Sequence, residues 1–412
     1  MDGLKNIKFL LVDDDPGVVE IISGYLKQEN AVIDSTTSST EAYEKIVAQK
    51  PDCVILDIMM PELDGLELCK QLRREPVLKD LKIVILSGKS YEFDRSRAFS
   101  FGADGYFLKP ILDIDQFIND LQRIIDDKLE LQFWGVRGTL PVSGEDVLKY
   151  GGNTNCVSIK FPRNNLFIFD AGTGIKLLSN HLMKTHQSPI SVKIFISHPH
   201  WDHINALPFF TPLYIPGNEF EICGPSHGDI TMRELISSQM DGVYFPIRIK
   251  EFAARVYFRD LKEQEFEIDQ IKIKTMLLSH PGYCLGYRLE YKDKIICYVT
   301  DNELFRETSP YHNLDYFEKL SQFVNSADYL ITDSTYTDKE YKSKINWGHS
   351  PVSQVIKLAD HAKVKKLFLY HHDPDQTDQD IDDKYTIVKD LLKELDSRTI
   401  CIAPKEKQHF VL

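Results

Sequence analysis

Short apolar runs alternate with amphipathic stretches over residues 1–125. The apolar runs cover residues 8–12, 53–56, 83–86 and 105–108, and a helical spacing of apolar positions covers residues 17–28. This alternation predicts a parallel sheet with helices on both faces, because each strand and helix must bury an apolar side. We therefore expect a doubly wound α/β domain at residues 1–125.

The pattern changes near residue 129, where longer β-rich stretches with Gly and Asn begin. Residues 124–130 still carry a helical spacing and contain no Pro, Gly or Ser. We predict a stiff helical linker over residues 126–130, followed by a second domain over residues 131–412.

The composition is that of a globular protein, with 42% hydrophobic and 27% charged residues among 412. No apolar run approaches the roughly 18 residues that cross a bilayer, and the first residues lack a signal-peptide pattern, so we expect a cytoplasmic protein with no membrane partner. Seven cysteines without CxxC spacing predict reduced thiols that neither pair nor bind metal. The net charge of −13 and the lack of a helix-turn-helix pattern argue against DNA as a partner.

Polar residues follow the apolar runs of the first domain. They are Asp13, Asp14, Asp57, Ser87 and Lys109. Because parallel strands end at one edge of their sheet, we expect these side chains to share one crevice. Three carboxylates in one crevice repel each other unless a divalent cation lies among them, and oxygen ligands favour magnesium.

Residues 1–125 resemble the receiver domain of two-component response regulators. The motifs that carry the likeness are VDDDP at 12–16, LDIMMPELDG at 56–65, LSG at 86–88 and GYFLKP at 105–110. The resemblance implies a five-stranded parallel sheet and a phosphoacceptor at Asp57. It also implies that magnesium is bound by Asp13, Asp14 and Asp57.

The same resemblance assigns the residues around the phosphoacceptor. Ser87 and Lys109 would bind the phosphoryl oxygens, and Tyr106 would be the switch aromatic. The Lys109–Pro110 bond would be cis, which a proline amide permits. The implied partner is a sensor histidine kinase or a phosphotransfer protein.

A cluster of potential metal ligands follows the apolar run 192–196 directly. The cluster is an HxHxDH motif made by His198, His200, Asp202 and His203. Imidazole and carboxylate suit borderline divalent cations, with zinc first and manganese or iron as alternatives. A single tetrahedral ion that keeps one position open for water needs only three protein ligands. The four ligand-type residues of this motif therefore predict two metal ions.

Three further candidate ligands each follow an apolar run, namely His280, Asp301 and His371. His372 competes with His371, and we prefer His371 because it comes first after its run. Asp170 is expected to orient an imidazole rather than to bind metal, because metal-bound histidines usually donate their other nitrogen proton to such a group.

Residues 129–412 resemble the metallo-β-lactamase fold. Within that fold they are most similar to the phosphodiesterase branch of ribonuclease Z, class II cyclic-nucleotide phosphodiesterases and the accessory phosphodiesterase of carbon-phosphorus lyase. The supporting motifs are GGNTN at 151–155, DAGTG at 170–174, STYTD at 334–338 and WGHS at 347–350. The resemblance implies an αββα sandwich.

The resemblance also divides the candidate ligands between two metal ions. The first ion would be bound by His198, His200 and His280, the second by Asp202, His203 and His371, and both by a bridging Asp301. Asp202 is in addition a candidate for orienting the attacking water.

By this resemblance, His349 distinguishes phosphodiesterases from β-lactam or thioester hydrolases of the same fold. The resemblance implies that His349 contacts the scissile phosphate and protonates the leaving oxygen, and that Asp333 modulates it. The alternatives are that His349 only closes a loop beside Gly348 and Ser350, and that Asp333 is structural.

The sequence departs from the family in two places. Asn205 stands where many relatives have glycine, a change that removes no ligand. Ribonuclease Z uses a basic, Gly-rich arm, but the cations between the HxHxDH motif and His280 are interspersed with acids. Processing of transfer RNA is therefore disfavoured.

These features predict a response regulator with a catalytic output. The output would be a dimetal phosphodiesterase for a cyclic nucleotide or another small phosphodiester, regulated by phosphorylation of Asp57. The alternatives are a dimetal lactone or thioester hydrolase and a non-catalytic module that senses a nucleotide. A homodimer is the default expectation.

Overall fold

The computed structural model describes residues 3–88, 92–162, 165–185, 190–243 and 245–412. The chain forms two compact units. The first consists of Met1–Glu130, Lys160–Asn165 and Val411–Leu412, and the second of Leu131–Ile159 and Leu166–Phe410.

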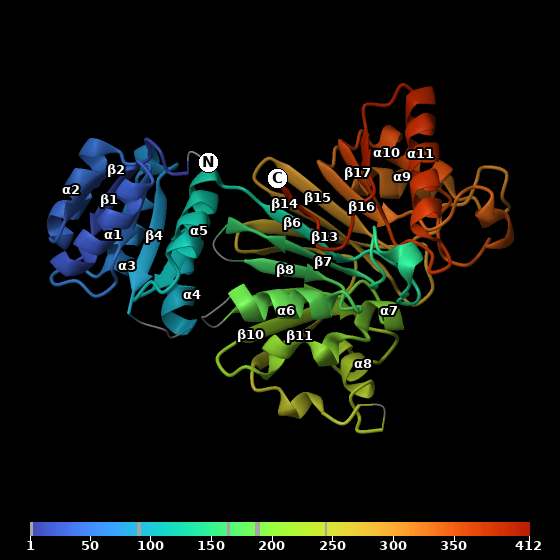
Figure 1. The fold of residues 1–412 in the computed structure, drawn as a ribbon, viewed down its shortest axis with the longest axis horizontal. Coiled ribbons are helices and arrows are strands. Elements are labelled where there is room, and N and C mark those ends of the chain that lie inside the picture. Colours follow the sequence, from blue (N-terminus) through green and yellow to red (C-terminus); the bar gives the residue numbers. More distant parts are fainter. Residues whose placement is uncertain (1–2, 89–91, 163–164, 186–189, 244) are drawn as a thin grey trace. The chain divides into compact units, whose positions relative to one another are not determined.

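The first unit contains a five-stranded parallel sheet with the strand order β2-β1-β3-β4-β5 (Figure 1). The strands are β1 (Lys8–Val12), β2 (Val32–Thr36), β3 (Cys53–Leu56), β4 (Lys82–Ser87) and β5 (Gly105–Leu108). All except β2 match the predicted apolar runs and are mostly buried. β2 escaped prediction because it is an edge strand with exposed polar positions.

Helices cover both faces of this sheet. Helices α1 (Pro16–Gln28) and α5 (Ile114–Asp126) pack on one face, and α2 (Ser39–Gln49), α3 (Gly65–Leu72) and α4 (Glu92–Ser100) pack on the other. Side chains of Asp or Ser cap the first turns of α1, α2, α3 and α5 by accepting backbone N–H groups. The predicted doubly wound fold is confirmed.

The predicted helical linker over residues 126–130 is wrong. Helix α5 ends at Asp126, because Asp127 adopts a left-handed conformation with φ of 58° and donates its N–H to the carbonyl of Arg123. Residues 127–129 are therefore not helical, and strand β6 begins at Glu130. A left-handed residue of this kind is a common helix stop that apolar spacing does not reveal.

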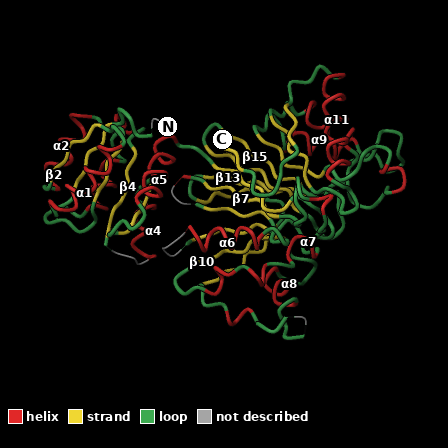
Figure 2. The backbone as a smooth tube through the Cα atoms, viewed as in Figure 1, coloured by secondary structure: helices red, strands yellow, loops and turns green. Residues whose placement is uncertain are grey.

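The second unit is built on two seven-stranded sheets (Figures 1 and 2). The first sheet contains, in spatial order, β11 (Arg255–Leu261), β10 (Glu219–Pro225), β9 (Ser191–Phe195), β8 (Leu166–Phe169), β7 (Cys156–Lys160), β6 (Glu130–Gly135) and β19 (His409–Val411). The second contains β12 (Glu265–Ile268), β13 (Ile271–Leu277), β14 (Leu285–Tyr291), β15 (Lys294–Val299), β16 (Tyr329–Asp333), β17 (Lys366–Tyr370) and β18 (Ile400–Ile402).

A layer of buried aromatic rings joins the two sheets. The ring of Phe169 on β8 lies 5.2 Å from that of Tyr298 on β15 and 5.7 Å from that of Tyr287 on β14, measured between centroids. Phe133 on β6 lies 5.2 Å from Phe368 on β17. Such rings bury large apolar areas, so this layer is a major part of the core.

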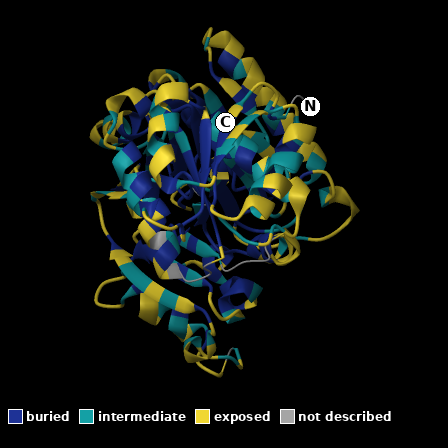
Figure 3. Cartoon of the chain, turned by 90° about the vertical axis from the view of Figure 1, so that its left-hand side faces the viewer, coloured by how far each residue is buried: buried dark blue, intermediate teal, exposed yellow. Residues whose placement is uncertain are grey.

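Helices cover the outer faces of both sheets. Helices α6 (Ile175–Thr185) and α8 (Met232–Ser238) pack on the first sheet, and α9 (Leu314–Phe323), α10 (Val352–His361) and α11 (Asp378–Glu394) pack on the second. The strands are largely buried while the outer helix faces are exposed (Figure 3). The predicted αββα sandwich is confirmed.

Two compositional predictions also bear on the fold. All seven cysteines lie in the described part of the chain as buried free thiols. None of the described helices is both long enough and apolar enough to span a bilayer.

Candidate receiver site and metal centre

The predicted receiver residues meet at the carboxyl end of the first sheet. Asp13 follows β1 and Asp57 follows β3, and both are buried. The Lys109 ammonium lies 2.6 Å from Asp13 Oδ2 and 3.1 Å from Asp57 Oδ1. Carboxylate oxygens of Asp13, Asp14 and Asp57 lie within 4.8 Å of one another, with Asp14 exposed. This oxygen-only cluster has the chemistry of a magnesium site.

Burial and ion pairing have opposite effects on the pKa values of Asp13 and Lys109 in the receiver cluster. Burial raises the pKa of Asp13, and the hydrogen bond to Lys109 only partly offsets it. For Lys109 burial acts in the opposite direction, but its two carboxylate partners outweigh burial and raise its pKa. The Lys109–Pro110 peptide bond is cis, as predicted.

Ser87 and Tyr106, the predicted switch residues, lie at the same end of the sheet. Ser87 ends β4, Tyr106 lies in β5, and both are buried. Burial raises the pKa of Tyr106, while a hydrogen bond with Ser87 acts against that rise. The two side chains are thus linked to each other.

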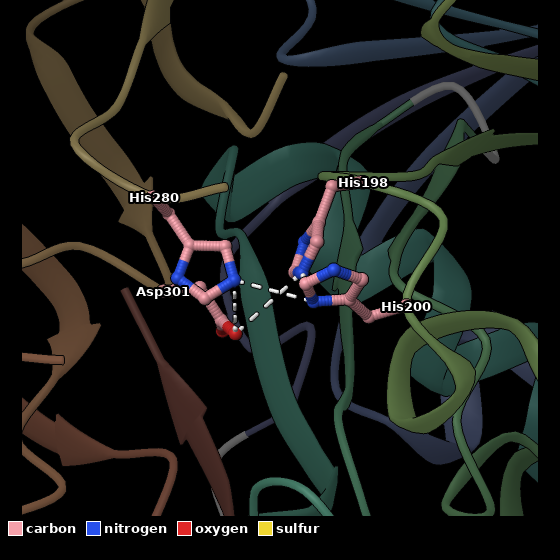
Figure 4. A group of neighbouring side chains, drawn as sticks. All are labelled: His198, His200, His280 and Asp301. Carbon is pink, nitrogen blue, oxygen red and sulfur yellow. Dashed lines mark hydrogen bonds and ion pairs between the residues drawn. The ribbon is translucent and has the colours of Figure 1, made fainter. Parts of the chain in front are cut away.

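In the second unit, four candidate ligands converge from the segments that follow three strands (Figure 4). His198 follows β9, His200 directly precedes the short helix α7 (Trp201–Ile204), His280 follows β13, and Asp301 follows β15. The nearest nitrogens of His198 and His200 are 2.8 Å apart, and those of His200 and His280 are 3.2 Å apart. Asp301 Oδ2 lies 3.6 Å from the Nε2 atoms of both His198 and His280.

A second group of ligand-type side chains shares Asp301 with the first. Asp301 Oδ1 lies 3.0 Å from His371 Nε2 and 3.2 Å from His203 Nε2. Asp202 Oδ2 lies 3.1 Å from the same nitrogen of His203 and 3.2 Å from that of His371. Each oxygen of Asp301 therefore faces one group, which is the arrangement of a bridging carboxylate.

Hydrogen bonds around the two groups orient the imidazole rings. His203 Nδ1 lies 2.7 Å from Asp170 Oδ2, and His280 Nδ1 donates to the carbonyl of Gly348 at 2.9 Å. Asp170 also accepts from Ser197 and from the phenol of Tyr298. When the Nδ1 atom carries the proton, the Nε2 atom presents its lone pair to the cluster.

These donors fit divalent cations. Burial, together with the neighbouring histidines, holds the pKa of His198 well below its ordinary value, so this ring is neutral. Burial alone would raise the pKa of Asp202, but His203 and His371 hold it well below its usual range. Imidazole nitrogens and ionised carboxylate oxygens that converge in this way are the donor set that zinc, manganese and iron share.

His349 and Asp333 form a buried pair beside both groups. His349 Nδ1 lies 2.7 Å from Asp333 Oδ2. Burial acts to lower the pKa of His349, but the charge of Asp333 and the hydrogen bond to it outweigh burial and raise that pKa to about 9. The ring centroid of His349 lies 4.8 Å from that of His371 and 5.3 Å from that of His280.

His371 and His372, which are adjacent at the end of β17, make different contacts. His371 points its Nε2 atom at Asp202 and Asp301, whereas His372 pairs through its backbone with Arg137 and is completely buried. Asn205 ends α7 in a right-handed conformation, which explains why a glycine is not needed there.

Sequence reasoning missed Glu303, a buried acid two positions after Asp301. Its carboxylate accepts hydrogen bonds from the loop that carries His349. No local signal marks Glu303, because its partners Asn346 and Gly348 lie 43 and 45 residues further along the chain. In addition, an isolated Glu is usually solvent-exposed.

Comparisons with known families agree with this architecture. The response regulator receiver domain matches residues 9–122, and the beta-lactamase superfamily domain matches residues 165–372, which is just over half of the chain. The chain therefore belongs to the beta-lactamase superfamily. More specifically, it joins a response regulator receiver domain to a beta-lactamase superfamily domain, whose clustered His and Asp side chains could hold divalent metal ions.

The chain is similar to different known proteins over separate parts of its length. It is 37% identical over 105 residues to the alkaline phosphatase synthesis transcriptional regulatory protein PhoP of Bacillus subtilis, covering 26% of this chain and 43% of PhoP, so it spans less than half of that relative. The metallo-beta-lactamase fold protein YhfI of Bacillus subtilis is 15% identical with a TM-score of 0.49, covering 69% of this chain and all of YhfI. The short form of human tRNase Z is 19% identical with a TM-score of 0.46, covering 68% of this chain and 98% of that one.

Proposed function

We propose that this protein is a response regulator whose output is a dimetal phosphodiesterase controlled by phosphorylation of Asp57. The observation that carries the proposal is the arrangement around Asp301. Two groups of ligand-type side chains share this carboxylate, and the His349–Asp333 pair lies beside both. A small phosphodiester such as a cyclic nucleotide is the proposed substrate.

We assign the first metal ion to His198, His200 and His280, the second to Asp202, His203 and His371, and both to Asp301. Zinc is the preferred ion because imidazole nitrogen predominates among the donors, with manganese or iron as alternatives. Two such ions would supply Lewis acidity, which would polarise a phosphoryl group and make water nucleophilic near neutral pH.

His349 is the proposed proton donor to the leaving oxygen. Asp333 holds the ring by its Nδ1 side, which leaves the Nε2 side available to substrate, and its charge keeps the imidazole protonated. An alkoxide needs such a proton because it is a poor leaving group.

Asp202 is proposed to orient the attacking water in addition to binding metal. Its Oδ2 accepts hydrogen bonds from the backbone N–H of Thr139 and the side-chain amide of Asn155. These bonds fix the carboxylate, so its direction does not depend on substrate.

In the receiver, Asp57 is the proposed phosphoacceptor, with magnesium held by Asp13, Asp14 and Asp57. Lys109 already contacts two of these carboxylates and is placed to neutralise phosphoryl oxygens. The linked Ser87 and Tyr106 would carry the change to the rest of the domain. The partner would be a sensor histidine kinase or a phosphotransfer protein.

The proposed catalysis is tested with bis-p-nitrophenyl phosphate. We expect hydrolysis by the zinc- or manganese-loaded protein and loss of hydrolysis in His198→Ala. Metal-loaded protein that hydrolyses no phosphodiester would contradict the proposal and favour the lactone, thioester or sensor alternatives.

A further inference from the structure

Glu303 is a buried carboxylate with an unusual set of partners. Only 2% of its surface is exposed, yet among the described residues no Lys, Arg or His forms an ion pair with it. Its Oε1 atom accepts from the phenol of Tyr341 at 2.6 Å and from the backbone N–H of Asn346 at 2.8 Å, and its Oε2 atom accepts from the N–H of Gly348 at 2.8 Å. These hydrogen bonds satisfy carboxylate oxygens that burial removes from water.

The loop that Glu303 holds also contacts a candidate metal ligand. The N–H of Gly348 donates to Glu303, and the carbonyl of the same residue accepts from His280 Nδ1 at 2.9 Å. Gly348 has φ of 87°, and a Cβ atom there would lie 2.4 Å from His280 Nδ1. The loop therefore packs directly on the His280 ring, and its position fixes which nitrogen of that ring faces the cluster.

The backbone before Glu303 is tied to the strand end that carries His280. The N–H of Glu303 donates to the carbonyl of Ser279 at 2.9 Å, and Asn302 Oδ1 accepts from the N–H of Ser279 at 3.1 Å. Asn302 also accepts a hydrogen bond from the phenol of Tyr316 on α9. Residues 302 and 303, which directly follow Asp301, thus connect this candidate ligand to the segment that carries His280 and to the loop that carries His349.

We infer that Glu303 is a positioning residue, which holds the loop 346–349 so that His349 and His280 both face the metal centre before substrate arrives. The inference rests on the proposed function for the role of His349. Glu303 does not touch the reacting groups, because its oxygens are used by Tyr341, Asn346 and Gly348. A carboxylate suits the task because both of its oxygens only accept, whereas an amide would turn an NH2 group toward at least one N–H or O–H donor.

The test is Glu303→Gln, assayed with phosphodiesters that share one scaffold but differ in leaving group. We expect kcat to fall by about tenfold or more for an alkyl alcohol leaving group, as for a lost charge-assisted hydrogen bond, and clearly less for p-nitrophenolate, which needs no proton. KM should change little. A variant that is merely less well folded would lose activity equally with both leaving groups.

A second measurement does not depend on turnover. We expect zinc affinity, measured by competition with a chromophoric chelator, to fall by about tenfold in Glu303→Gln, because the partner that orients His280 has moved. Tyr341→Phe keeps the carboxylate and removes one of its donors, so it should change both readouts in the same direction by less, and it serves if Glu303→Gln does not fold. Glu263→Gln is the matched control, since that carboxylate pairs with Lys319 and the backbone of Leu277 away from the loop.

The possible results separate the inference from the proposed function. Equal loss with every leaving group, or unchanged zinc affinity in Glu303→Gln and Tyr341→Phe, would overturn the positioning role. A wild-type protein that turns over no phosphodiester would refute the proposed function, and the zinc measurement would then decide the role of Glu303 by itself.

Discussion

The receiver site and the metal centre both lie where strands end, but they balance buried charge differently. In the receiver, the ammonium of Lys109 contacts Asp13 and Asp57 directly. In the metal centre, Asp202 and Asp301 face imidazole nitrogens, and none of the described Lys or Arg side chains forms an ion pair with either. The first site therefore contains a lysine ammonium of its own, whereas the second pairs its carboxylates with imidazoles, whose nitrogens can bind metal ions.

Among the variants that test this difference between the two sites, Asp301→Ala is expected to have the largest effect. Because each oxygen of Asp301 faces a different group of histidines, we expect loss of both metal ions and turnover below detection, a larger effect than the 10–100-fold that loss of an orienting partner costs. Metal content by atomic emission and hydrolysis of bis-p-nitrophenyl phosphate measure the two effects. Asp293→Ala, which removes an exposed acid at the β14–β15 turn, is the control, and an Asp301→Ala protein that keeps two ions would contradict the assignment.

The next largest effect is expected for His349→Ala. Loss of a proton donor should reduce kcat for alkyl phosphodiesters by about 10²–10⁴-fold while metal content stays the same. Hydrolysis of a lactone or thioester, if present, should change little. A parallel loss of esterase activity would show that His349 supports the centre in general and does not serve phosphodiester cleavage.

A smaller, directional effect is expected for Asp333→Asn. The charge of Asp333 raises the pKa of His349 to about 9, so turnover that needs protonated His349 persists below that pH and declines above it. Removing the charge lowers the pKa of His349. The decline should therefore move to lower pH, by on the order of one unit, in a kcat profile for an alkyl phosphodiester. A profile that stays in place would separate Asp333 from the protonation of His349.

The smallest effect concerns magnesium at the receiver. Because Lys109 already neutralises two of its carboxylates, removing magnesium should shift the thermal midpoint of the first unit by about 1 °C or less, whereas stripping the metal centre should shift the second unit by about 5 °C or more. Calorimetry with selective chelators distinguishes the two transitions. A larger shift for the first unit would reverse the comparison.

Much of the fold, and the clustering of ligand-type side chains, was predictable because the relevant signals are local. Strand ends are marked by buried apolar runs, and His198, His280, Asp301 and His371 each follow one. The HxHxDH spacing adds the remaining ligand candidates within one short segment. Local patterns of this kind can be recognised without knowledge of tertiary contacts, because they are set by strand geometry.

The features that sequence reasoning missed depend on contacts between distant segments or on single backbone conformations. The bonds from Glu303 to the loop 346–349 exist only after two segments pack together. The end of α5 depends on the left-handed conformation of Asp127. An Asp tolerates this conformation, but its presence in the sequence does not predict it. The edge strand β2 was missed because its exposed positions carry no apolar run.

The most direct test of the account is the response of hydrolysis to phosphorylation. Turnover of bis-p-nitrophenyl phosphate by the metal-loaded protein would be measured with and without a small phosphodonor, in the wild type and in Asp57→Asn. We expect the phosphodonor to change kcat or KM in the wild type and to change neither in Asp57→Asn, which keeps basal turnover. Identical turnover in all four conditions would contradict a receiver that controls the metal centre.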